Sequence, residues 1–558
     1  MDPASLGLAV AGVLELCFKY GNKLLLLCRQ YRSLDAELGE TLLTIQASWI
    51  KMDIQLRTLR SLSSKLDTVL LTLYHDALTR LEAKLSKAAD SFQVLQAKAG
   101  MAYNVHQKLK VVYLKRELSQ MVEEFENWQR RFDPSWYLIS RIADPGVDGE
   151  LKDVAGRSKQ VPGLDFNTQQ PSSGSSPSLL LARMRESIKQ IESQGAETSE
   201  SVFKDAAALC TDIVKIQGTN AYLARYKNTK RHVLLDPANR LAIGNKSQSQ
   251  ISPATAKLNI RDLARLLQHI DSSTFHLLRC AGVVEISTEQ GAQFHLLLEL
   301  PAPLQTSTPR TLRTLLSQTP KCSLTQRIKL AQQLARSVMF VHASGFVHKN
   351  IRPETILTFP SANPAASNAT CNMDIDPSFL IGFELFRRAE GRTDKFGDLD
   401  WSKNLYRHPL RQGLYPEYLF EMRHDVYSLG VCLLEVAMWE SFVQSSDQLL
   451  NKDQSHYKDS ENETDSDLPW PGLGIEVALH EKDARRAAFI VKDRLVEMTK
   501  EVLPALVGDR YTGVVIACLC CLDDGDDNTF RDAKGLGLQD RDGIIVGVRY
   551  IENVSFDH

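Results

Sequence analysis

A short polar stretch, residues 348–356, holds the side chains of this chain that most suggest chemistry, and it reads His-Lys-Asn-Ile-Arg-Pro-Glu-Thr-Ile. Asn350 lies two residues after His348, and its neutral amide cannot take a proton at neutral pH. A positioned general base typically contributes about 10²–10⁴-fold in rate. Because the sequence offers no evident substitute for such a base, we expect the stretch to lack acid–base catalysis.

Several motifs flank this stretch, and the order in which they follow along the chain is informative. Apolar residues recur with helical spacing from Leu324 to Val341, just upstream of it. Downstream, residues 379–384 read Phe-Leu-Ile-Gly-Phe-Glu, residues 406–409 read Tyr-Arg-His-Pro, and residues 425–431 read Asp-Val-Tyr-Ser-Leu-Gly-Val. Together they resemble protein kinases, whose H-R-D-L-x-x-x-N, D-F-G and D-V-W-S-x-G motifs follow in this order. The resemblance begins at about residue 202 and implies a two-lobed α+β kinase-like fold.

The resemblance also implies that phosphoryl transfer is lost. Kinases place the catalytic base at the position of Asn350 and two magnesium ligands at the positions of Thr355 and Gly382. Magnesium demands hard oxygen ligands, and Gly382 offers none. Arg352 lies within the same degenerate stretch. The positions that hold the family's large lobe together are retained, and they are His348, Pro409, Asp425, Tyr427 and Gly430.

The expected small lobe has lost its nucleotide contacts as well. A phosphate-binding loop needs several glycines, and residues 215–220 supply only Gly218. The strand 233–237 has no lysine at its end, and the following helix, 258–270, has no glutamate, only Asp262. Remnants of the nucleotide site would be Gly218, Glu299 and Leu300. We interpret this region as a pseudokinase with no cofactor or metal, and the sequence leaves open whether ATP binds without being hydrolysed.

The amino-terminal third is predicted to be a helical bundle. Apolar residues spaced by three and four mark one helix from Leu34 to Leu59 and another from Leu114 to Phe132, with a further helix from Leu66 to about Leu85. The members of these stripes are expected to pack in a core. They are Leu34, Leu38, Leu42, Ile45, Trp49, Met52, Leu56 and Leu59, then Leu114, Leu118, Met121, Phe125, Trp128 and Phe132.

The first helix is a candidate for membrane insertion or oligomerisation. From Ala4 to Leu27 it would be about 36 Å long, enough for a hydrocarbon core of about 30 Å. Its polar residues fall on one face and its apolar residues on the rest, namely Glu15, Lys19 and Lys23 against Leu6, Val10, Val13 and Leu14. Such a helix crosses lipid only if several copies shield its charges. Burial in the bundle is the other interpretation, and both hold if the helix is released on activation.

The first residues, Met-Asp-Pro-Ala-Ser-Leu-Gly-Leu-Ala-Val-Ala-Gly-Val, followed by leucine-rich helices, resemble the HeLo domain of fungal prion-inhibition and incompatibility proteins of the HET-S type. The resemblance covers roughly residues 1–150. It implies a helical bundle whose amino-terminal segment becomes membrane-active in regulated cell death. With the pseudokinase, the layout resembles fungal HeLo-kinase proteins. The partners implied are further copies of the chain, an upstream protein activator and membrane lipid.

Composition and boundaries fit this layout. Of 558 residues, 66 are Lys or Arg and 68 are Asp or Glu, so we expect no binding to nucleic acid. Scattered cysteines and the lack of a secretory signal predict a cytoplasmic protein. The resemblance to HeLo proteins implies that it associates with the plasma membrane on activation. The predicted parts are the bundle 1–142, a flexible linker 143–178, a connector helix 179–200, and a kinase-like domain 201–555 with a small lobe to about 300, a large lobe beyond, and a polar insertion at 451–467.

Two other functions stay open at this level. Displaced carboxylates and lysines could rebuild the nucleotide site of an unconventional active kinase. A soluble interaction scaffold is the third hypothesis, in which the leucine-rich start only packs in the core.

Overall fold

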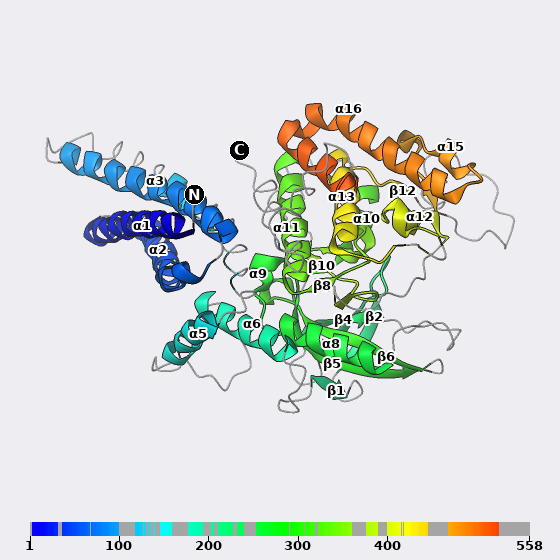
Figure 1. Cartoon of the computed structure of the whole chain (residues 1–558), viewed down its shortest axis with the longest axis horizontal. Helices are drawn as coiled ribbons and strands as arrows, with labels where there is room; N and C mark the ends of the chain where they lie inside the picture. The colour runs from blue at the N-terminus through cyan, green and yellow to red at the C-terminus, as the bar shows by residue number, and fades with distance from the viewer. Residues whose placement is uncertain are drawn as a thin grey trace. The chain divides into compact units, whose positions relative to one another are not determined.

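The structure is a computed structural model, and the chain forms two compact units, residues 1–192 and 193–558, described separately here (Figure 1). The description covers the following residues: 3–31, 36–66, 68–99, 118–125, 128–129, 132, 136, 139, 145–158, 177–192, 202–205, 210–226, 231–238, 253–288, 291–305, 307–318, 322–359, 375, 377–388, 399–413, 416, 418–444 and 467–523.

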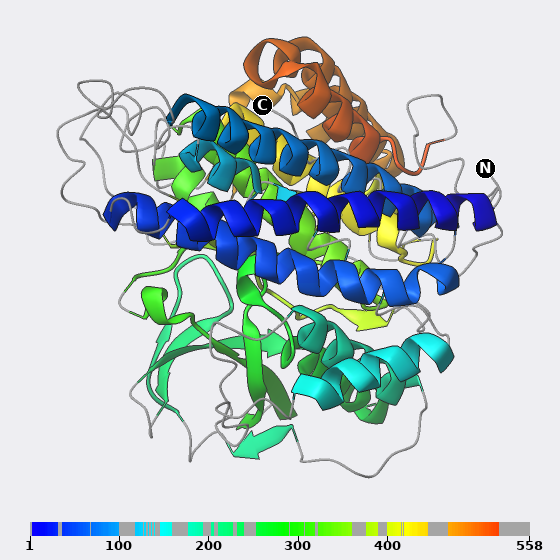
Figure 2. The ribbon, with the colours of Figure 1, turned by 90° about the vertical axis from the view of Figure 1, so that its left-hand side faces the viewer.

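Long helices build the first unit. Helix α1 (Pro3–Tyr31) packs against both α2 (Ala36–Leu62) and α3 (Thr68–Ala99), and Figure 2 shows it running between them. A single 3-10 turn, η1 (Ser63–Lys65), precedes α3. Helix α3 continues well beyond Leu85, where the predicted helix ended. Thus α1 is the central helix of the described part of this unit.

The predicted apolar stripes form the core of this unit. In α2 the stripe members are at most 2% exposed, namely Leu42, Ile45, Trp49, Met52, Leu56 and Leu59. The members of the stripe from Leu118 to Phe132 are at most 8% exposed. Trp128 and Phe132 stack with ring centroids 4.6 Å apart, and Trp128 Nε1 donates to the Ala77 carbonyl at 2.8 Å. The helical periodicity is therefore confirmed as core packing at these positions. Leu34 and Leu114 lie outside the described residues, as does the side chain of Leu38.

The segment predicted as a flexible linker contains a helix, α5 (Pro145–Ser158). It packs with α6 (Pro177–Glu192) and α2. Arg185 Nε donates to Asp148 at 2.8 Å and Lys189 Nζ donates at 3.1 Å. A connector helix was predicted over 179–200, and the helix observed there, α6, ends at Glu192 and packs within the first unit.

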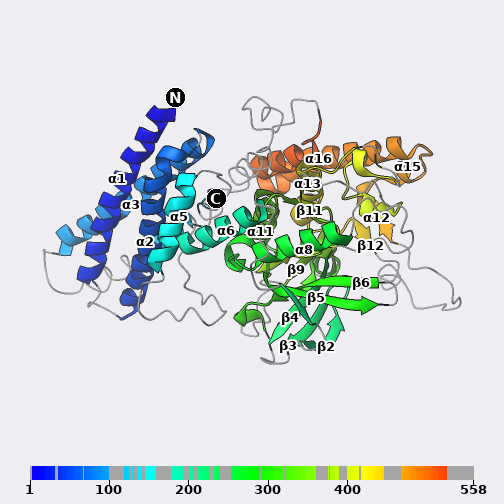
Figure 3. The same ribbon diagram turned by 60° about the horizontal axis from the view of Figure 1, so that its bottom comes forward.

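A six-stranded mixed sheet opens the second unit, in the order β1-β5-β6-β4-β3-β2. Strand β1 is parallel to β5 and all other neighbours are antiparallel. Figure 3 shows helix α8 (Pro253–Leu267) beside the sheet, where it packs on β5. The strands are β1 (Phe203–Asp205), β2 (Cys210–Lys215), β3 (Tyr222–Tyr226), β4 (His232–Ala238), β5 (Arg279–Thr288) and β6 (Gly291–Glu299).

The rest of the second unit is mainly helical. Helix α11 (Leu324–Ala343) packs on α13 (Met422–Met438), which packs on α16 (Ala484–Leu519). The shorter described elements of this unit are α9 (Ser272–Phe275), η3 (Ala302–Leu304), β7 (Arg310–Thr311), α10 (Leu312–Gln318), β8 (Phe346–Val347), η4 (Pro353–Thr355), β9 (Ile356–Thr358), β10 (Ser378–Leu380), β11 (Arg387–Arg388), α12 (Trp401–Asn404), η6 (Pro409–Arg411), β12 (Val443–Gln444), β13 (Leu468–Pro469), η7 (Pro471–Leu473) and α15 (Glu476–Leu479).

Helix α16 is the one described helix that is long and apolar enough to cross a membrane by length and composition. Half of its apolar window is buried inside the fold. The helix is also broken at Gly508, where φ is 82° and ψ is 166°. These features are those of a core helix in a folded unit.

At the level of fold class, the prediction is confirmed in part. A helical amino-terminal region is followed by a mixed α+β region with a six-stranded mixed sheet. The predicted helix from Leu324 to Val341 is α11, and it ends at Ala343, shortly before His348. Of the predicted polar insertion, residues 451–466 lie outside the described residues.

Candidate functional site

The polar stretch 348–356 borders a cavity of about 230 Å³ in the second unit. The cavity lies where the turn after β2, the end of β4, this stretch and the segment after β10 meet. Its lining is polar on most sides and consists of Lys215, Gly218, Thr219, Asn220, Ala221, Asp236, Asn350, Arg352, Glu354, Thr355, Ile381, Gly382 and Glu384. Sequence reasoning named five of these positions, namely Gly218, Asn350, Arg352, Thr355 and Gly382, and the fold brings them together.

Asn350 has its hydrogen-bonding groups occupied by its neighbours. Its Nδ2 donates to the Gly382 carbonyl at 3.3 Å, while its Oδ1 accepts from Arg352 Nε at 3.1 Å. Thr355 Oγ1 donates to the Asn350 carbonyl at 2.8 Å. The amide therefore joins the two sides of the cavity and is held in one orientation.

His348 is a neutral, buried side chain. Its Nε2 lies 3.1 Å from the Ile381 carbonyl, and the Asn350 backbone N–H donates to its Nδ1 at 3.3 Å. This arrangement requires the proton on Nε2. Burial lowers the pKa of His348 to about 4, so the ring carries no charge at neutral pH. His348 thus positions the backbone of the stretch and the segment after β10.

Asp236 is the residue of this site that sequence reasoning missed. It is 1% exposed on strand β4, and its carboxylate accepts from the Gly382 N–H at 2.9 Å and from the Phe383 N–H at 3.2 Å. Burial raises its pKa to about 7, against the lowering effect of these hydrogen bonds. A signal existed in the sequence, because an acid directly follows the apolar run Val233-Leu234-Leu235, in the strand that was predicted to match the V-A-I-K strand of kinases.

Gly382 and Thr355 interlock. Gly382 has φ of 87°, a conformation that L side chains rarely adopt. A Cβ added there would lie 2.5 Å from Thr355 Cγ2, far inside van der Waals contact. An acidic side chain at 382 therefore cannot be accommodated while Thr355 keeps its place.

The remaining charged groups of the cavity are engaged separately. Asn220 Nδ2 donates to Glu384 at 2.6 Å, and Arg313 Nε donates to Glu354 at 3.1 Å. Each carboxylate faces a different partner. Within the ranges given above, no three acidic, histidine or cysteine side chains are grouped so that they could hold a metal ion.

Two of the predicted nucleotide remnants do not line this cavity. Glu299, at the end of β6, accepts from Arg279 Nη1 at 3.3 Å. Leu300 is buried and its carbonyl accepts from Gln305 Nε2 at 2.7 Å. Both residues make these contacts at the carboxyl-terminal end of β6, an interior strand of the sheet.

Asp425, in the first turn of α13, fixes the backbone at the start of the 348–356 stretch. Its carboxylate accepts from the backbone N–H of His348 at 2.7 Å and of Lys349 at 2.8 Å, and lies 3.1 Å from His342 Nε2. Burial would raise the pKa of Asp425, but His342 and His348 outweigh it and hold the pKa below its ordinary value. Lys349 has φ of 68°, so these bonds fix a strained backbone.

The other predicted frame residues lie around α13. Tyr427 is 1% exposed, with its ring in edge contact with His408 at 5.1 Å between centroids. A Cβ on Gly430 would lie 2.7 Å from Cys518 Cβ, so glycine permits the close approach of α13 and α16. Pro409 begins the 3-10 turn η6.

In the first unit, the predicted membrane-active face of α1 is largely in the core. Leu6 is 7% exposed, and Val10 and Leu14 are fully buried, while Val13 is half-buried. The polar residues lie at the surface. Glu15 pairs with Arg60 at 2.7 Å, Lys23 lies 4.0 Å from Asp90, and Lys19 Nζ lies 5.5 Å from the ring centroid of Tyr20.

No family model matches this sequence, and no curated protein sequence matches it.

Asp236 makes a pH dependence testable. Its pKa is about 7 in the fold and near 3.8 when unfolded, so its contribution to stability is lost as pH rises from about 4 to about 7. Asp236→Asn stays neutral and can still accept from both N–H groups. We therefore compare the free energy of unfolding of the variant with that of the natural chain. We expect this difference to shift in favour of the variant by roughly 2–4 kcal/mol as pH rises from 4 to 8. Urea denaturation at several pH values measures the difference.

Asp212→Asn is the matched control for this experiment. Asp212 has a side chain 65% exposed and φ of 51°, which asparagine also tolerates. This variant should follow the natural chain at every pH. Equal pH profiles for the Asp236→Asn variant and the natural chain would contradict the raised pKa.

Proposed function

We propose that the second unit is a protein kinase-like domain that no longer transfers phosphate, and that it regulates the first unit. The first unit is proposed to be a HeLo-like bundle that assembles with further copies and disrupts membranes in fungal regulated cell death. The observation that carries this proposal is the interlock of Gly382 with Thr355, closed by Asp236 on the Gly382 and Phe383 amides.

The arrangement of the second unit supports a kinase-like fold. A mixed sheet with an adjoining helix precedes the helical part, and Asp425 of α13 holds the backbone of the 348–356 stretch. That is the architectural role of the D-V-W-S-x-G aspartate in kinases. The likeness in sequence and the placement of these motifs around one cavity point the same way.

The cavity lacks the strand lysine and the space that a bound triphosphate needs. A kinase places a lysine on this strand against the phosphates, whereas here the strand supplies Asp236. Glu384 and Glu354 add two further acidic side chains to the lining. A volume of about 230 Å³ is also below the roughly 300–1,000 Å³ of most small-molecule sites. Lys215 and Arg352 also line the cavity, so its charge is mixed. Nucleotide binding is therefore unfavourable mainly on grounds of space and of the missing lysine.

Features of the first unit support a bundle able to rearrange. Helix α1 exposes apolar side chains at Leu8 (75%), Leu16 (40%) and Leu26 (59%). Among the described residues, the buried Gln46 Nε2, Gln129 Nε2 and Trp136 Nε1 have no hydrogen-bond partner. A buried polar group without a partner costs about 1–3 kcal/mol, so this core is less stable than an apolar one of the same size.

Vesicle leakage tests the membrane activity. The full chain is clustered through a fused inducible dimerisation domain beside dye-filled vesicles of phosphatidylcholine and phosphatidylserine. We expect dye release on clustering, and its loss when Leu8→Asp and Leu16→Asp are combined, because charges on exposed α1 positions oppose entry into lipid. Leu419→Asp, at a 63% exposed position of the second unit, is the control. Silence of the clustered natural chain would instead favour an interaction scaffold.

A second candidate function rests on the carboxylates that line the cavity. If Asp236 and Glu384 held magnesium for a displaced nucleotide, the chain would be an unconventional active kinase. Titration with ATP, with and without magnesium, separates the two. We expect no thermal shift and no phosphate transfer, and robust turnover abolished by Asn350→Ala would establish the kinase instead.

A further inference from the structure

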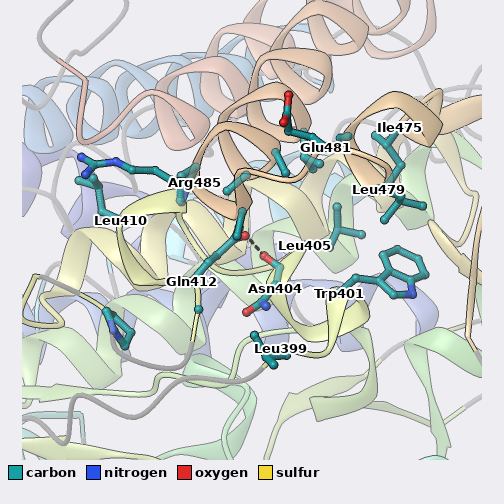
Figure 4. Close-up of a pocket in the computed structure, with 18 of the residues that line it drawn as sticks. Leu399, Trp401, Asn404, Leu405, Leu410, Gln412, Ile475, Leu479, Glu481 and Arg485 are labelled. Carbon is teal, nitrogen blue, oxygen red and sulfur yellow. Dashed lines mark hydrogen bonds between the residues drawn. The ribbon is translucent and has the colours of Figure 1, made fainter.

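An apolar groove of about 410 Å³ lies in the second unit, away from the polar cavity. One wall comes from the segment around α12 and η6, and the other from α15 and the first turns of α16 (Figure 4). Most of the lining is apolar, including Leu399, Leu405, Leu410, Ile475, Leu479 and Val491.

The walls of the groove are suited to an apolar segment. Leu399 is 68% exposed, Leu479 43% and Tyr418 49%, which is a concentration of apolar surface at one place. Gln412 Nε2 donates to the carbonyls of Asn404 at 2.8 Å and Arg407 at 2.7 Å, so its amide is engaged within the wall (Figure 4). An occupant therefore gains mainly from burying apolar side chains.

The chain leaves the described fold beside this groove. Asp523, the last described residue, is ion-paired with Lys492 on α16. Lys492 follows Val491, which lines the groove. Cys521 Sγ also contacts the Arg423 carbonyl at 3.1 Å, which fixes the end of the described chain. The residues beyond, 524–558, thus start next to the groove.

The sequence beyond Asp523 contains one strongly apolar segment. Residues 543–551, here named the tail segment, read Gly-Ile-Ile-Val-Gly-Val-Arg-Tyr-Ile. By contrast, the start of this part of the chain is acidic, since residues 523–527 read Asp-Asp-Gly-Asp-Asp. The tail segment is rich in β-branched residues and carries one charge. Nineteen residues, 524–542, lie between Asp523 and the tail segment, and a chain of that length extends to about 60 Å at most, so the tail segment can reach the groove from Asp523.

We propose that the tail segment of the same chain occupies this groove. Tethering favours it over a partner in solution, because joining two groups in one chain raises the effective concentration of one at the other. Docking buries Leu399, Leu479 and Tyr418 together with the isoleucines and valines of the tail segment. A partner that binds this groove must then displace the tail segment, which makes the groove a covered regulatory surface. This proposal does not depend on the proposed function.

Photo-crosslinking in the full chain tests the proposal, with Tyr550 replaced by p-benzoylphenylalanine. We expect intramolecular cross-links to residues 399–418 or 475–491, with a yield independent of protein concentration. Leu479→Asp should lower that yield by about tenfold or more, because it puts a charge where apolar burial is gained. Leu324→Asp is the control, since Leu324 has the same exposure of 43% at the start of another helix.

Each other outcome overturns the proposal. Cross-links that join two chains and grow with concentration would assign the groove to a second copy. Cross-links to other surfaces, or a yield that Leu479→Asp leaves unchanged, would remove the tail segment from the groove. Melting curves of the Leu479→Asp and Leu324→Asp variants show that the folds compared are intact.

Discussion

Replacing Gly21 with alanine is expected to loosen α1 from α2. A Cβ at this position would lie 2.1–2.3 Å from three ring carbons of Trp49. Trp49 is 2% exposed, so its ring has no open space into which it could move. Overpacking a core typically costs about 1–3 kcal/mol, whereas removing a glycine from a helix interior gains about 0.5–1 kcal/mol. Thermal denaturation followed by circular dichroism measures the net loss.

Gly12→Ala is the control for that substitution. Gly12 lies on the same helix, and a Cβ there meets nothing within 4 Å. It should be neutral or slightly stabilising. Both variants gain the same helix propensity, so they should differ by the overpacking cost alone, about 1–3 kcal/mol. On the proposed function, Gly21→Ala should also release dye from vesicles without clustering. Identical melting of the two variants would refute the tight contact between α1 and Trp49.

The largest loss of stability is expected for Asp425→Ala in the second unit. The substitution leaves the N–H groups of His348 and Lys349 without their acceptor in a fully buried place. Each buried group left without a partner costs about 1–3 kcal/mol, and removing one side of a buried charged cluster costs about 3–5 kcal/mol. We expect a loss of that order in urea denaturation, with the 348–356 stretch opened to protease.

Asp400→Ala sets the scale for this comparison. Asp400 caps α12 and accepts from the Ser402 N–H at 3.0 Å, and losing such a cap costs about 1 kcal/mol. Because the pKa of Asp425 is lowered, its contribution is present above the ordinary carboxyl pKa and is lost as pH falls through the lowered value. The two variants should therefore differ most near neutral pH. A loss for Asp425→Ala no greater than for Asp400→Ala would exclude the anchoring role.

Periodicity predicted most of the helical core, because burial of one face of a helix repeats along the sequence. The stripes of α2 and α11 were found this way. Helix α5 was missed because Pro145, Gly146 and Gly149 look like linker residues. Proline is well suited to the first turn of a helix, and here α5 starts at Pro145. Helix α5 contacts α6 through the hydrogen bond between Asp148 and Arg185. These two residues are 37 positions apart, so no local sequence pattern predicts that they pair.

The residues of the site that belong to sequence motifs could be predicted. Those that reach the site only through tertiary contacts could not. The motifs singled out Asn350, Thr355 and Gly382, and all three line one cavity. Asp236 escaped notice because its role appears only when β4 lies against the backbone of Gly382, 146 residues further along the chain. The positive φ of Gly382 and the contact of its would-be Cβ with Thr355 are likewise three-dimensional facts.

The interlock of Gly382 and Thr355 has an evolutionary consequence if this unit descends from an active kinase. A lineage that acquired aspartate at 382 first would suffer the clash with the threonine methyl before gaining any chemistry. A lineage that first replaced Thr355 would forfeit the hydroxyl that holds the Asn350 and Arg352 carbonyls. Either substitution alone destabilises the fold without restoring a magnesium ligand. Under that descent, the loss of catalysis is therefore difficult to reverse by single substitutions.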